Sequence, residues 1–260
     1  MLFRASIEIE FDYKKFCFRL LGSKKKLYIF TKKEVNALVQ TINFISTNIQ
    51  FPGLFRIIDN RQNVQIILKK FKHGDPFLFR YLYDNCTPID CTNALSQYLL
   101  QHKPLMPQRI QSLICASNDG VTIKTVALDA LGLLYDEFKN CNNFILIYKL
   151  LDLMKILMTR GSQRPTEMRI CHAPFILVPM FFEETREILL NYKKICDVIH
   201  EMILLSGLLR SSSELSKAIL QNRLSYDIQR TCEMNLHRKP KALNKKNFHR
   251  RLSSIELLIL

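Results

Sequence analysis

The 260-residue chain is 48% hydrophobic and 23% charged, a balance that is typical of a folded globular protein and excludes global disorder. Its formal net charge of +15 favours acidic partners, namely nucleic acid, anionic lipid or an acidic protein surface. The chain has only seven glycines and nine prolines, which favours long helices over a turn-rich β architecture.

The N-terminal residues carry a β pattern. Apolar residues alternate with acidic ones between Ile7 and Phe11, and this period of two predicts a strand. Apolar stretches at 16–21 and 26–30 predict two further strands. We therefore expect residues 1–27 to form an N-terminal extension with β character.

Residues 28–206 show helical periodicity. Apolar residues recur every three or four positions from Val35 to Ile45, and Thr31 or the lysines after it are expected to open that helix. Asn60 suits the N-cap of the second helix. The pattern predicts an all-α domain of eight or nine helices. The remaining helices are expected as a short piece within 75–90, from Asp90 or Thr92 to about Gln101, and over 108–116, 121–139, 141–159, 165–173 and 183–205.

Two segments follow this domain. Residues 211–214 have the sequence of a capping box, which predicts an additional helix within 207–236. Residues 237–260 form a basic tail that we expect to be mobile, since 237–251 alone hold seven Lys or Arg. This charge suits an anionic membrane surface. Aromatic residues are not regularly interleaved with it, so nucleic acid is not expected as a partner.

The eight cysteines include no CxxC pair and no Cys/His cluster with zinc-finger spacing, so the sequence predicts no metal site. No signal peptide is recognisable, and no apolar run is long enough to span a bilayer. We therefore expect reduced thiols and a cytoplasmic location. A glycine-rich phosphate loop and a protease-like Cys/His pair are both lacking, which argues against an autonomous hydrolase or kinase.

The stretch 51–61 interrupts the helical pattern. Pro and Gly at 52–53 stop a helix, so Arg56 should lie on a short loop between two helices. Leu54 and Phe55 would hold that loop on the core, and the guanidinium would project outward from a fixed base. Two interpretations are open at this point: a salt bridge that ties the loop to a helix, or a group that acts on a partner.

Four blocks of sequence, taken in order, resemble Rho-GAP domains. The first block comprises GLFR at 53–56, NRQNV at 60–64 and KKFKHGD at 69–75. The other three are NALSQYLL at 93–100, the shortened turn KPLMP at 103–107, and TEMRICHAP at 166–174. Their order and separation are more specific than any single block. The resemblance covers about residues 28–206.

In Rho-GAP domains the arginine of the first block enters the active site of a small GTPase. The resemblance therefore implies that Arg56 is an arginine finger and that the protein activates a Rho/Rac-type GTPase in its GTP-bound state. Such a protein supplies a catalytic group in trans and is not itself an enzyme. It needs no cofactor. It would switch off signalling in the cytoplasm or peripherally at the inner membrane surface.

The same resemblance implies partner contacts from Asn60, Arg61, Ser96, Leu100 and Glu167. The family usually has a lysine and an arginine at the positions of Ser96 and Leu100, and an asparagine at that of Glu167. These departures motivate an alternative function. The chain would then be a catalytically weak or inactive Rho-GAP-like module that binds a small GTPase or another protein as a scaffold.

Overall fold

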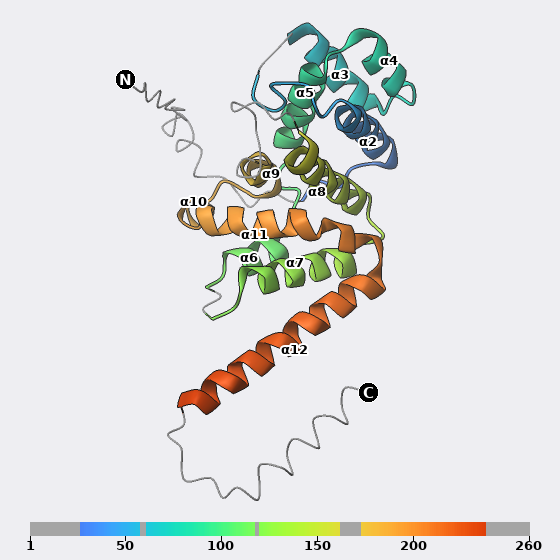
Figure 1. The fold of residues 1–260 in the computed structure, drawn as a ribbon. Helices are drawn as coiled ribbons and strands as arrows, with labels where there is room; N and C mark the ends of the chain where they lie inside the picture. Colours follow the sequence, from blue (N-terminus) through green and yellow to red (C-terminus); the bar gives the residue numbers. More distant parts are fainter. Residues whose placement is uncertain (1–26, 58–60, 118–119, 162–172, 238–260) are drawn as a thin grey trace, which may run out of the picture. The chain divides into compact units, whose positions relative to one another are not determined.

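Eleven α-helices and one 3-10 helix make up the regular structure of the described residues, which contain no strand (Figure 1). The structure is a computed structural model that describes residues 27–57, 61–117, 120–161 and 173–237. The helices are α2 (Lys32–Thr47), α3 (Arg61–His73), α4 (Leu78–Asn85), α5 (Pro88–Gln101), α6 (Gln108–Cys115), α7 (Ile123–Phe138), α8 (Asn142–Arg160), α9 (Ala173–Phe181), α10 (Arg186–Leu190), α11 (Tyr192–Leu205), the 3-10 helix η2 (Ser206–Arg210) and α12 (Ser212–His237).

The predicted all-α character is confirmed for these residues. Ten helices, α2 to α11, fall within residues 28–206, slightly more than the eight or nine expected. One reason is that the predicted helix over 183–205 is two helices, α10 and α11. Asn191 lies between them as the C-cap of α10, and its backbone N–H and side-chain amide both donate to the carbonyl of Glu187, at 3.1 and 2.9 Å.

Helix α9 occupies most of the apolar run 174–182, where the sequence predicted no helix. The run is apolar on all sides and contains Pro179 inside the helix, so no amphipathic period is visible. The turn at 103–107 completes the end of α9. There the N–H groups of Leu105 and Met106 donate to the carbonyls of Met180 and Phe181, at 3.0 Å each.

The residues before α2 do not form the strand expected over 26–30, as far as they are described. Their backbone groups bond to side chains of α8 instead of to a neighbouring strand. Asn143 accepts from the N–H of Phe30 at 3.0 Å and donates to the carbonyl of Tyr28 at 2.7 Å. Asn142 donates to the carbonyl of Phe30 at 2.9 Å. These amides satisfy the backbone, so no partner strand is needed.

Helices α2 and α5 begin with the same reciprocal cap. Thr31 accepts from the N–H of Glu34 at 3.2 Å, and the Glu34 carboxylate accepts from the N–H of Thr31 at 2.8 Å. Thr87 and Asp90 repeat this exchange at α5, at 3.1 and 3.0 Å. Thr31 was one of the residues expected to open α2. Helix α5 begins at Pro88, earlier than predicted, because proline suits the first helical position.

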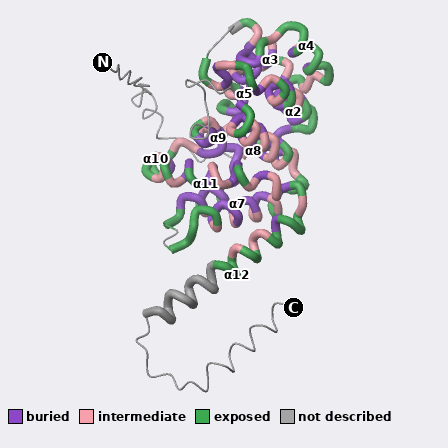
Figure 2. Tube along the Cα trace, viewed as in Figure 1, coloured by how far each residue is buried: buried purple, intermediate pink, exposed green. Residues whose placement is uncertain are grey.

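Two groups of helices share one hydrophobic core. Helix α2 packs against α3, α4, α5 and α8, while α11 packs against α6, α7, α8 and α9 (Figure 1). Helix α8 contacts both α2 and α11 and so joins the two groups. The buried residues of these helices are purple in Figure 2. The largest fully buried side chains include those of Phe30, Phe71, Phe181 and Phe182.

The chain divides into two compact units, Met1–Ile219 and Leu220–Leu260. Helix α12 begins in the first unit, where Ser211 accepts from the N–H of Glu214 at 3.4 Å, as the predicted cap requires. Leu215 is buried just after this cap. The domain boundaries expected from the sequence stay predictions. No helix within the described ranges is long and apolar enough to cross a membrane.

Four of the sequence predictions concern residues outside the described part of the chain. They are the β extension up to residue 26, the N-cap at Asn60, the helix over 165–173 that carries Glu167, and the basic tail from residue 238 onward.

Candidate functional site

Arg56 lies on a tight turn between α2 and α3, as the sequence predicted. The N–H groups of Arg56 and Ile57 both donate to the carbonyl of Gly53, at 3.1 and 3.0 Å. Gly53 has a φ of 86° and Phe55 a φ of 59°, and glycine adopts such angles without the steric cost that a side chain brings. The side chain of Arg56 is exposed at the end of this turn.

The core and helix α5 hold the Arg56 turn in place. Leu54 is 2% exposed and belongs to the core, so the turn is attached by a buried side chain. The N–H of Phe55 donates to the hydroxyl of Thr92 at 3.4 Å, and Thr92 donates in turn to the carbonyl of Ile89 at 3.0 Å. The hydroxyl can do both because it has one donor and two lone pairs.

A second contact fixes the far side of the turn. The side-chain amide of Asn93 donates to the carbonyl of Ile57 at 3.0 Å. Thr92 and Asn93 are consecutive on α5, so both ends of the turn rest on a single helical turn. Arg56 is thus presented from a rigid base, which is the arrangement expected for a group that must act on a partner at a defined position.

Ser96 and Leu100 lie on the same side of α5 as Asn93, because residues three or four apart are neighbours on a helix surface. Leu100 is 38% exposed, Ser96 is half-buried, and Gln97 between them is exposed. We call the surface formed by Asn93, Ser96, Gln97 and Leu100 the α5 face. It begins at Asn93, whose side chain binds the carbonyl of Ile57 in the Arg56 turn. Two of the predicted site residues, Ser96 and Leu100, thus lie on the helix that supports Arg56.

The other predicted contacts are placed in part or not at all. Arg61 is the first residue of α3, and its side chain is outside the described part. Asn60 and Glu167 are likewise outside it. The start of α3 is nevertheless fixed on α5, because the side-chain amide of Asn63 donates to the Asp90 carboxylate at 3.1 Å and to the carbonyl of Asn85 at 3.2 Å.

The sequence did not single out Thr92, Asn93 and Asn63 as residues that position the site. Their polar side chains on predicted helices suit a solvated surface equally well. One signal was present, since Asn93, Ser96 and Leu100 share a stripe at helical spacing. That stripe alone does not reveal which backbone carbonyl the Asn93 amide binds.

The cysteines around α5 do not support nucleophilic catalysis by the protein itself. Cys86 and Cys91 carry free thiols, and burial raises the pKa of both, that of Cys86 to about 11. A thiol held protonated is a poor nucleophile and a poor metal ligand. Within the described ranges no group of three or more His, Cys, Asp or Glu side chains lies close enough together to hold a metal ion.

The Asp90 carboxylate is a buried acceptor with one oxygen that lacks a protein partner. Its Oδ2 atom accepts from Thr87 and Asn63, whereas Oδ1 has no hydrogen-bond partner and the residue is 1% exposed. Because Oδ2 already caps α5 and holds α3, the carboxylate has a structural role beneath the Arg56 turn.

Comparisons with protein-family models, with curated proteins and with solved structures give no match for this chain. Membership of the Rho-GAP family therefore stays a hypothesis. It rests on the order of the sequence blocks.

Proposed function

We propose that the protein is a GTPase activator for a Rho/Rac-type small GTPase and that Arg56 is its arginine finger. The protein would bind the GTPase in its GTP-bound state through the Arg56 turn and the α5 face. It would have no catalytic cycle of its own and would end signalling by speeding hydrolysis on the partner.

The chemistry requires a cation at the site of hydrolysis. Cleavage of the terminal phosphate of GTP spreads negative charge over the phosphoryl oxygens, and a guanidinium supplied in trans stabilises that charge. Arginine suits this role because its planar fork binds two oxygens at once and stays charged when water is excluded. An arginine finger raises the rate of GTP hydrolysis by a factor of roughly 10³–10⁵.

The observation that carries the proposal is the combination of an exposed arginine with a fixed backbone. Leu54 is buried, Thr92 and Asn93 bond the backbone of the turn, and Arg56 itself is exposed. A rigid base lowers the entropy lost on binding, because the backbone of the turn is already ordered before a partner arrives. The sequence block around Arg56 adds the family resemblance to this geometry.

Single-turnover GTP hydrolysis on a panel of Rho-type GTPases tests the proposal. The full chain should accelerate hydrolysis, and Arg56→Ala should abolish the acceleration while the GTPase is still bound. Arg56→Lys should recover little of it, because lysine cannot bind two oxygens at once. Arg109→Ala is a matched control, since this arginine is 72% exposed on α6 and pairs with Glu137. No acceleration by the wild-type chain at high concentration would refute the proposal.

A second function is favoured by the α5 face. The family has basic residues where this chain has Ser96 and the exposed Leu100, so the face offers a neutral rather than a cationic contact. The chain would then bind a GTPase, or another protein, as a scaffold without activating it. Binding to a GTP-loaded GTPase with an unchanged hydrolysis rate would select this alternative. Leu100→Ser should then weaken binding, whereas Arg56→Ala should leave it unchanged.

A further inference from the structure

Helix α4 and the residue before it expose three aromatic rings. Phe77, which precedes the helix, is 77% exposed, Phe79 is 44% exposed and Tyr83 is 76% exposed. Phe79 and Tyr83 are four residues apart and share one side of the helix. Single exposed apolar residues are common on protein surfaces, but three large exposed rings within seven residues are typical of an interaction site. We call these three residues the α4 aromatic face.

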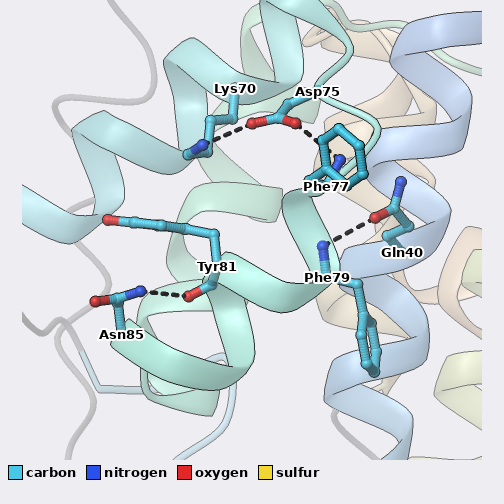
Figure 3. A network of polar contacts seen from close by, with 7 residues as sticks. All are labelled: Gln40, Lys70, Asp75, Phe77, Phe79, Tyr81 and Asn85. Carbon is cyan, nitrogen blue, oxygen red and sulfur yellow. Dashed lines mark hydrogen bonds and ion pairs between the residues drawn. The ribbon is translucent and has the colours of Figure 1, made fainter.

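The packing of α4 fixes where these aromatic residues lie. Leu78 and Leu82 are fully buried and occupy the side of α4 that faces the core. The N–H of Phe79 donates to the side chain of Gln40 on α2 at 2.9 Å, and the Phe79 ring meets Phe44 edge-on, with centroids 6.3 Å apart. Figure 3 shows Phe77 and Phe79 on the α2 side of α4, close to Gln40.

The turn before α4 fixes Phe77 in the same way. Asp75 accepts from the N–H of Phe77 at 2.8 Å and from the Lys70 ammonium at 2.6 Å (Figure 3). The Lys70 ammonium also lies over the Tyr81 ring, 4.6 Å from its centroid. Asp75 is therefore neutralised by Lys70 and adds little negative potential beside the exposed ring of Phe77.

Exposed basic residues lie just before α4 and within it. Lys72 and His73 end α3 just before this turn, and both are exposed. Lys33 of α2 is exposed and abuts Gly74, since a Cβ atom added to this glycine would lie 2.4 Å from the Lys33 Cβ atom. Arg80 lies among the rings with its side chain 87% exposed, and it pairs only loosely with Asp84, at 3.8 Å.

We propose that the α4 aromatic face docks on an anionic lipid surface. The rings of Phe77 and Tyr83 would enter the headgroup region, and the nearby basic groups of Lys33, Lys72 and Arg80 would lie at the level of the lipid phosphates. Aromatic rings favour the membrane interface, and each basic residue near an anionic leaflet adds to the attraction. A second copy of this chain suits the face poorly, because the same positive charges would meet each other across the interface.

This docking is independent of Arg56 and of any GTPase. It also differs from the attraction expected of the basic tail at 237–251. A tail binds through charge alone, whereas the α4 aromatic face adds the transfer of apolar rings out of water. Partial burial of two rings should strengthen vesicle binding by about tenfold or more.

Sedimentation of the full chain with phosphatidylcholine vesicles, with and without phosphatidylserine, tests the inference. The wild-type chain should bind only the vesicles that contain phosphatidylserine. The double variant Phe77→Ser, Tyr83→Ser should bind the phosphatidylserine vesicles at least about tenfold more weakly than the wild type. The matched control is Leu190→Ser, Leu224→Ser, which removes two apolar side chains that are 77% and 54% exposed elsewhere. It should bind like the wild type.

Charge and self-association are separated by two further measurements. Lys33→Gln, Lys72→Gln should weaken binding to phosphatidylserine vesicles while the protein stays folded, because both side chains are exposed. Failure of the wild-type chain to bind, or equal binding by the ring variant and its control, overturns the proposal. Sedimentation velocity of the wild type and the ring variant without lipid provides the last check. A wild-type dimer that is absent in the ring variant would also overturn the proposal, because the α4 aromatic face would then join two copies of the chain.

Discussion

Replacement of Glu34 should reveal how strongly the start of α2 is tied to α5. Glu34 is 6% exposed and its carboxylate is a hub for three donors. One oxygen accepts from the hydroxyls of Tyr98, at 2.8 Å, and Tyr28, at 3.0 Å. The other accepts from the N–H of Thr31 at 2.8 Å. These contacts join α2, α5 and the residues before α2 at one point.

The expected loss follows from the number of bonds. Hydrogen bonds to a charged group contribute about 1.5–3 kcal/mol each, and an unpaired buried hydroxyl costs about 1–3 kcal/mol. Glu34→Ala removes all three bonds and leaves the hydroxyl of Tyr98, which is 4% exposed, without its acceptor. We expect it to lower the free energy of unfolding by about 5 kcal/mol, at the lower end of the sum of three such bonds. Glu34→Gln keeps one acceptor oxygen and should lower it by about 1–2 kcal/mol.

Urea unfolding at neutral and acidic pH measures this effect. Burial raises the pKa of Glu34, but hydrogen bonds from Thr31, Tyr98 and Tyr28 outweigh it and hold the pKa below its ordinary value of 4.5. The stabilisation by the carboxylate is therefore fully present above pH 4.5 and is lost as the pH falls through the lowered pKa. The deficit of Glu34→Gln relative to the wild type should shrink in that range.

A matched control is Glu187→Gln, because Glu187 is exposed on α10. It should change the free energy of unfolding by no more than about 0.5 kcal/mol. Equal stability of Glu34→Gln and the wild type at neutral pH would refute the stabilising role of the Glu34 carboxylate. A deficit that does not change as the pH falls would show that shape rather than charge matters at this position.

Three further predictions concern other parts of the fold. Gly53→Ala should destabilise the protein by about 1–2 kcal/mol in urea unfolding, because φ is 86° there and the new carbon would lie 2.3 Å from the Ile57 Cδ1 atom; an unchanged midpoint would contradict the turn geometry. Asn143→Ala should cost about 2–4 kcal/mol in the same assay, since this 1% exposed amide bonds two backbone groups of the residues before α2; a loss below about 1 kcal/mol, on the order of one surface bond, would speak against these contacts. The thiol of Cys91 is fully buried and burial raises its pKa, so peptide mapping after treatment with a thiol reagent should find it modified only in urea. The half-buried Cys141 should react before Cys91 does, and early modification of Cys91 would count against the packing of α5.

The helices that the sequence predicted well are those with one apolar face. In α2 the residues from Val35 to Ile45 recur at helical spacing and are buried as that spacing requires. Helix α9 lacked such a signal. Its residues are apolar on every side, and the donors that complete its end come from Leu105 and Met106, more than seventy residues earlier. A local pattern cannot report a partner that far away.

The strand predicted over 26–30 fails for a related reason. The short apolar stretch before Thr31 resembles a strand in composition, but its backbone bonds go to Asn142 and Asn143 on α8. An asparagine that binds a distant backbone has no sequence signature that separates it from a surface residue. The strand prediction relied on composition alone and had no information about this competing partner.

At the candidate site, too, the sequence predicted the local features and missed those that depend on distant residues. The Pro-Gly break and the apolar pair Leu54 and Phe55 were enough to predict the Arg56 loop, because these residue types act locally on the backbone. Its supports were not predicted, because Thr92 and Asn93 act across thirty-six or more residues. The sequence therefore predicts where the arginine is presented, and the structure adds what holds it there.

The dependence of the Arg56 turn on α5 has a consequence for protein engineering. The five residues from Gly53 to Ile57 are not a portable motif, because their backbone relies on the hydroxyl of Thr92 and the amide of Asn93. A graft of the turn onto another helical scaffold would need a host helix with a threonine and an asparagine in the same register, and a cavity for Leu54. Design effort that began from α5 and added the turn to it would preserve the geometry; transfer of the loop sequence alone would lose it.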